Sequence, residues 1–303
     1  MCENRKDAAA GSLSGLSVRA LTQPLDVLKI RFQLQVESIS CRNGGYYQSM
    51  HQALRRIIQE EGVCALWKGH LAGQFLSVIF TSSEFFFFHT FSDWSVNRLH
   101  CNRTALNDAI AGGMAGGITT FVCQPIDVLR TRLAGQGYIK VYRGFSHGVQ
   151  QMFVNEGLAS FWRGLAPSLI LIVPQNAIAF ATYEGLKRWF GGFPTFSLDS
   201  SVLLTLFSGA IAGCLARSAV YPLDVVKKRF QAVGFEEARR YFGRLPPKSN
   251  SEWGLVTADC LRRIYLEEGF MGIFKGWTPA MLKAGISTGL TFTFFEIYRQ
   301  LLC

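Results

Sequence analysis

Six apolar stretches divide the chain at nearly regular intervals. They lie near residues 8–30, 71–92, 105–129, 164–186, 201–226 and 278–298. Each is roughly 20 residues long, which is enough for an α-helix to cross the hydrocarbon core of a bilayer. The pattern therefore predicts an all-α membrane protein with six transmembrane helices.

Polar residues interrupt several of these stretches, and the first contains Arg19, Gln23, Asp26 and Lys29. A helix surrounded by lipid would exclude such charges, whereas a helix in a bundle can direct them toward a water-filled interior. The pattern is typical of a transporter. A soluble helical repeat protein is the alternative interpretation.

Shorter segments with apolar residues at helical spacing connect the first stretch to the second, the third to the fourth and the fifth to the sixth. They cover residues 47–60, 145–154 and 255–265. A helix with one apolar and one polar face can lie along a membrane surface. We therefore expect three amphipathic surface helices.

Glycines spaced four residues apart occur in the first, third and fifth stretches. They are Gly11 and Gly15, Gly112 and Gly116, Gly113 and Gly117, and Gly209 and Gly213. Small residues at this spacing let two membrane helices approach closely. The pattern predicts close helix contacts at these positions.

A two-part motif occurs three times. Its first part reads proline, any residue, acid, two residues, base, one residue, base, and it begins at Pro24, Pro125 and Pro222. Its second part reads acid, glycine, four residues, aromatic residue, base, glycine, and it ends at Gly69, Gly164 and Gly276. The recurrence at about a hundred residues indicates tandem triplication, with repeats over 1–100, 101–196 and 197–303.

The formal net charge of +10 is unevenly distributed. The connections inside the repeats (34–69, 134–163 and 231–276) contain fourteen lysines and arginines, and those between the repeats (93–104 and 187–199) contain four. This asymmetry predicts that all three internal connections lie on one side of a membrane. It favours a membrane protein over a nucleic-acid-binding protein.

No group of residues suited to catalysis is apparent. The eight cysteines include no CxxC pair and no nearby histidine–cysteine cluster. A metal site or a disulfide framework is therefore not expected. We expect neither an enzyme nor a resident cofactor.

The triplicated motif resembles the signature of the mitochondrial carrier family, and the resemblance covers nearly the whole chain. It implies six transmembrane helices around a pseudo-three-fold axis in the mitochondrial inner membrane. It also implies a monomer with both termini toward the intermembrane space and the internal connections toward the matrix. The implied activity is secondary transport by alternating access around a midplane site, with exchange of substrates.

The resemblance also implies a matrix gate of three ion pairs between repeats: Asp26 with Arg130, Asp127 with Lys227, and Asp224 with Lys29. Gln33 and Gln231 match the glutamine braces of such a gate, whereas Ala134 occupies the equivalent position of the second repeat. The spacing of acid and base within each repeat also permits pairing along one helix. The sequence itself leaves the two arrangements open.

On the opposite side, the family has an aromatic-acid-two residues-base gate on the even-numbered helices. Two copies fit this pattern, with the residues Tyr183, Glu184, Lys187, Phe295, Glu296 and Arg299. The second stretch has His89 and Ser92 where an acid and a base are expected. We therefore expect a weak cytoplasmic gate and a resting state open to that side.

Cations within the stretches indicate an anionic substrate. Arg19, Thr120 and Arg217 lie seven residues before the three motif acids and on the same helical face. Lys283 is a third cation, which the ion-pair gate leaves unmatched, and it matches a contact position of the family. Arginine and lysine side chains suit a small phosphorylated substrate, although interfacial pairing or snorkelling of these bases is the alternative. The other polar candidates are Ser77, Glu84, Gln175, Asn176 and Ser287.

Glu84 is a lone acid among these candidate bases. It suits a cationic or amino-bearing end of a substrate, and it could equally pair with a neighbouring base. Stretches such as 19–21, 67–70 and 282–289 resemble the branch of the family that carries thiamine pyrophosphate, a diphosphate with a cationic ring. Glu84, Gln175 and His89 depart from the glutamine, tyrosine and acid expected there. A carrier of nucleotides or coenzyme A and a non-transporting scaffold are the alternatives.

The second part of the motif places a base and a glycine at the start of each even-numbered helix. These residues are Lys68, Gly69, Arg163, Gly164, Lys275 and Gly276. Free backbone amides at a helix start, next to a base, can bind an anion, and the resemblance implies a cardiolipin phosphate. Alternatively, the glycines only interrupt the helix and the bases snorkel.

Overall fold

The computed structural model describes residues 2–36, 45–99, 105–191, 198–235 and 253–302, and in these ranges the chain is helical without β-strands. Six long helices coincide with the six apolar stretches, which confirms the all-α prediction. They are α1 (Cys2–Leu34), α3 (His70–Leu99), α4 (Ala105–Gly135), α6 (Leu165–Gly191), α7 (Leu198–Gln231) and α9 (Trp277–Leu302).

Three segments in the described part of the chain are long and apolar enough to span a membrane. These are Val63–Trp94, Leu158–Lys187 and Ser208–Gln231. They fall in the regions of α3, α6 and α7. The remaining long helices are more polar over such a window or contain more charge, as α1 does with Arg19, Asp26 and Lys29.

Three short helices occupy the predicted connectors: α2 (Met50–Glu61), α5 (Phe145–Glu156) and α8 (Trp253–Glu268). Each ends at the glycine of the acid-glycine pair, with φ of 83°, 78° and 74° at Gly62, Gly157 and Gly269. Residues with a side chain rarely adopt this left-handed conformation. The glycine therefore stops each helix and directs the chain into a 3-10 turn, namely η2 (Val63–Trp67), η3 (Leu158–Trp162) and η5 (Phe270–Phe274).

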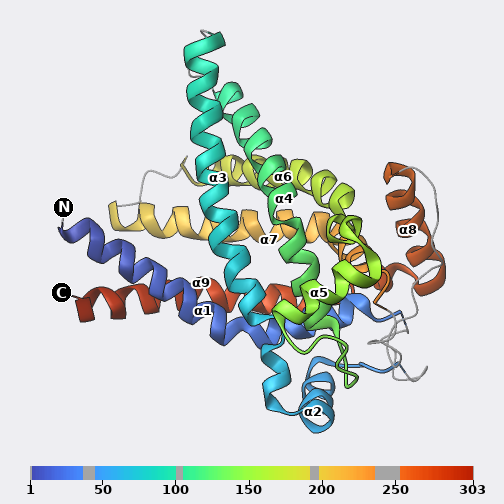
Figure 1. Ribbon diagram of the computed structural model, residues 1–303. Helices are drawn as coiled ribbons and strands as arrows, with labels where there is room; N and C mark the ends of the chain where they lie inside the picture. Colours follow the sequence, from blue (N-terminus) through green and yellow to red (C-terminus); the bar gives the residue numbers. More distant parts are fainter. Residues whose placement is uncertain (1, 37–44, 100–104, 192–197, 236–252, 303) are drawn as a thin grey trace.

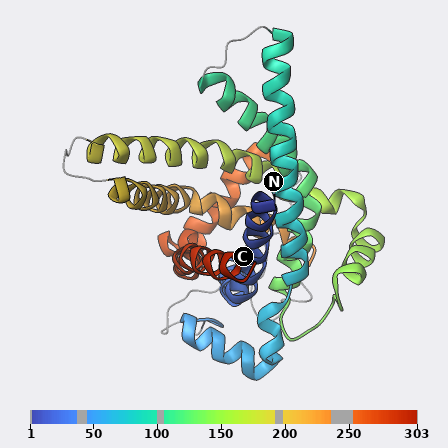
Figure 2. The same cartoon turned by 90° about the vertical axis from the view of Figure 1, so that its left-hand side faces the viewer.

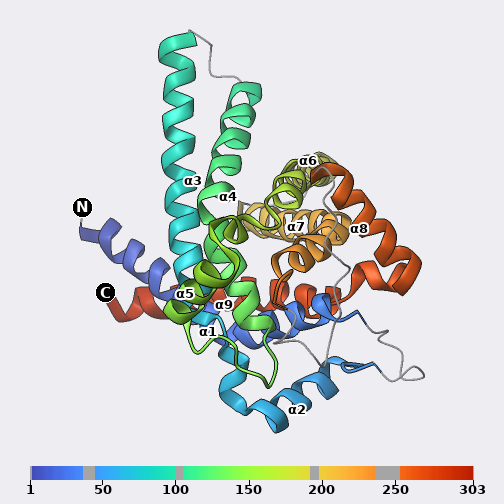
Figure 3. The same ribbon diagram turned by 45° about the vertical axis from the view of Figure 1, so that its right-hand side comes forward.

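The long helices pack as three pairs, each composed of helices from two different repeats: α1 with α9, α3 with α4, and α6 with α7. Figure 2 shows the pairs diverging from a common region, and Figure 1 shows both ends of the chain at the free end of the α1–α9 pair. The helices α2, α5 and α8 surround the end at which the pairs converge (Figure 3). The structure is therefore closed at one end and spread at the other.

Close packing holds the converging end together. Gly69, Gly164 and Gly276 precede α3, α6 and α9, and a Cβ on them would lie 3.1, 3.1 and 2.8 Å from the main-chain oxygens of Arg130, Lys227 and Lys29, respectively. All three glycines also have positive φ. Both properties explain why the second part of the motif ends in glycine.

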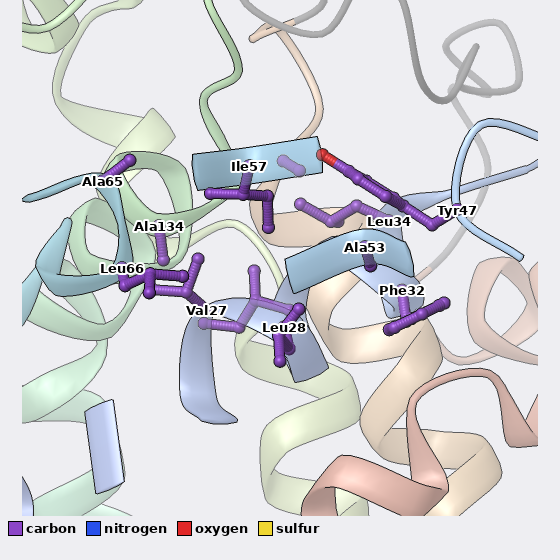
Figure 4. Packing of buried hydrophobic residues seen from close by; sticks show 12 residues of the cluster. Val27, Leu28, Phe32, Leu34, Tyr47, Ala53, Ile57, Ala65, Leu66 and Ala134 are labelled. Carbon is purple, nitrogen blue, oxygen red and sulfur yellow. The ribbon is translucent and has the colours of Figure 1, made fainter. Parts of the chain in front are cut away.

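Apolar packing is concentrated at the same end. Buried residues of α1 such as Val27 and Leu34 pack against Ile57 of α2, against Leu66, and against Ala134 of α4 (Figure 4). Burial of this kind stabilises the contact by about 25 cal/mol per Å² of apolar surface. It joins the first repeat to the second at the base of the bundle.

The prediction of close contacts at the small-residue positions is wrong for the first and fifth stretches. A Cβ on Gly11, Gly15, Gly209 or Gly213 would meet no atom within 4 Å. In α4, by contrast, Gly116 faces Ile172 at 3.9 Å. The N-terminal halves of α1 and α7 lie where the helix pairs diverge, so these glycines face open space.

Candidate functional site

Three ion pairs join the helices α1, α4 and α7 at the converging end. Arg130 Nη2 lies 2.5 Å from Asp26 Oδ2, Lys227 Nζ lies 2.9 Å from Asp127, and Lys29 Nζ lies 2.7 Å from Asp224. Each pair connects two repeats, and together they form a cycle, which we call the ion-pair ring. The structure thus adopts the pairing between repeats and not the pairing along one helix.

Two of the ring pairs have a glutamine beside them. Gln33 Nε2 donates to Asp224 at 2.9 Å and to the Tyr221 hydroxyl at 3.1 Å, and Gln231 Nε2 donates to Asp127 at 2.8 Å. Ala134 has no group that could do the same for Asp26. The ring therefore lacks three-fold symmetry in its hydrogen bonds.

Asp26 has a second base beside it, Lys283 of α9. Its Nζ donates to Asp26 Oδ1 at 2.6 Å, while Arg130 contacts the other carboxylate oxygen. The expectation that the ring leaves Lys283 unmatched is therefore wrong. The side chain remains 24% exposed, so the ammonium group lies at the boundary between the ring and the interior of the bundle.

Sequence reasoning missed Lys228, a second lysine in the ring. Its Nζ contacts Asp127 Oδ1 at 3.0 Å, Thr131 Oγ1 at 2.9 Å and Gln231 Oε1 at 2.9 Å. The signal was present, because the third motif copy has two consecutive lysines where the other copies have one base. Asp127 is consequently the most heavily bonded acid of the ring.

The candidates on α1, α4 and α7 differ in their surroundings. Arg19 and Arg217 form no ion pair in the part of the chain that the structure describes, and Arg217 is exposed. The Thr120 hydroxyl is buried and donates to the Gly116 carbonyl at 2.7 Å within its own helix. The arginines are therefore available to a ligand, whereas the Thr120 proton is already committed.

The candidates on α3, α6 and α9 reach the surface of the bundle to different degrees. Glu84 and Asn176 are exposed, and Ser77, Gln175 and Ser287 are half-buried. Within the described residues Glu84 has no basic partner, so the alternative of pairing with a neighbouring base is not realised in this conformation. Its carboxylate is open to a ligand.

The structure does not bring together the residues of the expected cytoplasmic gate. Tyr183, Glu184 and Lys187 lie on α6, and Phe295, Glu296 and Arg299 lie on α9. Among the described residues there is no ion pair between Glu184 and Arg299, and Figure 2 shows their helices separating toward this end. The conformation is open on this side, and whether His89 and Ser92 favour it remains a prediction.

The bases expected to bind lipid point into the protein. Glu61 binds Arg31 of the first motif part and Lys68 of the second, and Lys68 Nζ also donates to the Gly137 carbonyl of the next repeat at 3.0 Å. Arg31 likewise donates to the Gln136 carbonyl at 2.8 Å. The bases thereby satisfy carbonyl groups just beyond the end of α4, which would otherwise lack a partner.

The other two repeats contain the same three-residue arrangement, which we call the triad. Its members are Arg31, Glu61 and Lys68; Arg132, Glu156 and Arg163; and Arg229, Glu268 and Lys275. The Lys275 side chain is only 2% exposed. In this structure the charges of Lys68, Arg163 and Lys275 therefore serve internal contacts, and lipid binding by these bases remains a prediction.

The electrostatics of Glu61 follow from its two partners. Burial raises the pKa of its carboxyl group, but hydrogen bonds from Arg31 and Lys68 lower this pKa by more, so that it lies below the usual value. The resulting stabilisation is present above the unfolded-state pKa and is lost as the pH falls through the folded-state pKa. The Glu61 carboxylate is therefore charged at neutral pH.

Comparison with known proteins agrees with this architecture. A family model described as mitochondrial carrier protein matches residues 3–99, 102–193 and 199–303. A Homo sapiens protein named mitochondrial thiamine pyrophosphate carrier is 40% identical over 302 residues, which cover 96% of this chain and 90% of the relative. The Bos taurus protein of that name is 39% identical over 304 residues, covering 97% and 92%. A Zea mays protein named mitochondrial thiamine diphosphate carrier 1 is 33% identical over 312 residues, covering 96% and 92%. The chain belongs to the mitochondrial carrier family.

Proposed function

We propose that the protein is a secondary transporter that exchanges thiamine pyrophosphate across the mitochondrial inner membrane. The observation that carries the proposal is 40% identity over nearly the whole chain to a relative named for this substrate. The arrangement of charges agrees with the ligand. Arg19, Arg217 and Lys283 supply cations for a diphosphate, and the exposed Glu84 supplies an acid for a cationic ring.

In this proposal all six long helices cross the membrane as a monomer, with both termini in the intermembrane space. The ion-pair ring closes the matrix side, and the diverging pairs admit substrate from the other side. A buried ion pair suits a gate because the attraction between its members is largely offset by their desolvation. Substrate contacts that favour the opposite state can then shift the equilibrium between the two states.

We also propose that the protein binds cardiolipin, through fewer groups than the sequence suggests. With the bases engaged in the triads, the lipid phosphate would be held by backbone amides at the starts of α3, α6 and α9. Such amides are free donors at a helix N-terminus.

Ligand-dependent thermal unfolding of the purified protein tests the substrate. A ligand that binds the folded state alone stabilises it by about 2.7 kcal/mol at a hundred times its dissociation constant. We expect thiamine pyrophosphate to raise the unfolding temperature more than thiamine monophosphate, ADP or coenzyme A at equal concentration. A larger rise with ADP or coenzyme A would indicate a carrier of those compounds instead, and no rise with any of them would favour a scaffold.

Replacing Lys283 by methionine should weaken the binding of thiamine pyrophosphate by about tenfold or more. The reason is that a hydrogen bond to a charged group contributes roughly 1.5–3 kcal/mol. Thiamine monophosphate, which carries less charge, should lose less affinity, and the dissociation constants from the unfolding assay measure the difference. An equal loss for both ligands would mean that Lys283 acts only through Asp26. Leu282→Met, at the neighbouring exposed position, is the matched control.

A further inference from the structure

Three buried nitrogen atoms next to the ion-pair ring have no hydrogen-bond partner. They are Arg19 Nη1, His70 Nδ1 and Arg130 Nε. Nearly all buried polar groups in proteins are hydrogen-bonded, because an unpartnered one has lost its contacts with water without replacement. Three such groups in one region call for an explanation.

The side chains of Arg19 and His70 come together where α1 meets α3. Gln74 of α3 donates to the Leu16 carbonyl of α1 at 3.3 Å and lies 3.3 Å from His70 Nε2. Arg19 follows Leu16 by three residues and therefore lies on nearly the same face of α1. When the Gln74 amide donates to His70 Nε2, the proton of the neutral imidazole is on Nδ1. The unpartnered His70 atom is then a donor.

Arg130 approaches the same region from α4. A Cβ placed on Gly73, one turn beyond His70, would lie only 3.2 Å from Arg130 Nε. The charges of Arg19 and Arg130 both act on the His70 ring, which independently indicates that the three groups are neighbours. Arg130 directs Nη2 to Asp26, so its Nε remains for another acceptor.

The charges around these donors are unbalanced. Arg130 and Lys283 share the single carboxylate of Asp26, and Arg19 forms neither an ion pair nor a hydrogen bond with any described residue. Asp127, another acid that acts on Arg19, is already contacted by two lysines of α7. Two positive charges are left over, and an uncompensated charge inside a membrane protein is costly. A group with two negative charges would balance them.

We propose that Arg19, His70 and Arg130 form a subsite for a phosphate group beside the Asp26 pair. Guanidinium groups offer several donors in a fixed plane that matches phosphate oxygens, and the imidazole adds a neutral donor. The Arg19 side chain is partly exposed, so an anion can reach it from the interior of the bundle. The identity of the phosphate-bearing ligand rests on the proposed function, whereas the subsite itself does not.

Binding of inorganic pyrophosphate to the full-length purified protein tests the subsite without reference to the rest of the ligand. Its dissociation constant is obtained from the rise in unfolding temperature with concentration. We expect Arg19→Gln and His70→Leu each to weaken binding by about tenfold, the usual effect of losing a hydrogen bond to a charged group. His70→Gln keeps a donor and should lose less. His51→Leu, the same substitution on the exposed surface of α2, should have no effect.

Unfolding temperatures without ligand show whether each variant folds. If His70→Leu does not fold, Arg19→Lys provides the second comparison. It keeps the positive charge but lacks the planar set of guanidinium donors, so its affinity for pyrophosphate should lie between those of the wild type and Arg19→Gln. Unchanged pyrophosphate affinity in the folded variants, or no pyrophosphate binding by the wild type, would overturn the subsite. Pyrophosphate binding that depends on these residues, without binding of thiamine pyrophosphate, would instead uphold the subsite and contradict the proposed substrate.

Discussion

Exchanging the charges of Lys29 and Asp224 should restore transport that either single reversal abolishes. Lys29→Asp places two acids together and Asp224→Lys places two bases together, whereas the double variant re-forms the pair in the opposite direction. Lys29 and Asp224 are 24% and 20% exposed, so leaving one without its partner should cost less than the roughly 3–5 kcal/mol of a fully buried pair but more than the about 0–1 kcal/mol of a surface pair. Uptake of labelled thiamine pyrophosphate by liposomes measures the effect.

Lys29 and Asp224 are better suited to a charge exchange than the other two pairs of the ring, because fewer other charges contact them. Asp26 also binds Lys283, and Asp127 also binds Lys228, so a reversed charge at either acid would face a second lysine. Among the described residues, Asp224 contacts Lys29 and Gln33 and no second lysine, and a glutamine amide can turn to accept from a lysine. If the folded double variant transports no better than the single ones, the ring does not close the pathway.

Glu61→Gln should lower the unfolding temperature more than removing the charge of any other residue in α2. It removes the acid that both Arg31 and Lys68 contact, and the Arg31 and Glu61 side chains are only 1% and 3% exposed. The remaining buried cations would cost roughly 3–5 kcal/mol. Thermal unfolding of the purified protein at neutral pH measures the loss.

The adjacent Glu60 provides the matched control. Its ion pair with Arg56 lies on the surface, with side chains 34% and 37% exposed, and such pairs contribute about 0–1 kcal/mol. Glu60→Gln should therefore change the unfolding temperature little. Equal effects of the two substitutions would contradict the structural role of the triad.

The long helices could be predicted because their signal is local. Length and hydropathy define each apolar stretch without knowledge of its neighbours. The three glycines with positive φ before α3, α6 and α9 were likewise visible as a recurring motif, although their close approach to main-chain oxygens of another repeat was not. The helix pairing and the contact between Lys283 and Asp26, 257 residues apart, depend on the assembled bundle, and no periodicity in the chain relates such positions.

For Lys283 and for Lys68 with its counterparts, the sequence missed internal contacts for the same physical reason. Lys283 was expected to be unmatched because Asp26 lies on α1 and Lys283 on α9, and only the packing of these two helices brings them together. Lys68 and its counterparts were read as lipid ligands because the sequence shows a base at a helix start and not the carbonyls of the next repeat that it reaches. The repeated acid between two bases was nevertheless a usable signal, since Glu61, Glu156 and Glu268 recur with both motif parts.

The pattern of small residues also could not predict which conformation the helix bundle adopts. Close contacts expected at Gly11 and Gly209 are absent from the described structure because the helix pairs diverge there. An open state and a closed state use the same residues in different contacts, so a pattern of small residues does not specify which state is adopted. The weak second copy of the cytoplasmic motif, at His89 and Ser92, pointed to the open side without determining it.

Uptake of labelled thiamine pyrophosphate into liposomes that contain the purified protein tests directly whether the protein exchanges this compound. The liposomes are filled with unlabelled thiamine pyrophosphate or left empty, and the Lys29→Asp variant serves as the matched inactive protein. We expect saturable uptake by the wild type that is faster into filled liposomes and is lost in the variant. Uptake by the wild type that does not exceed that of the variant, with both proteins folded and inserted, would contradict it.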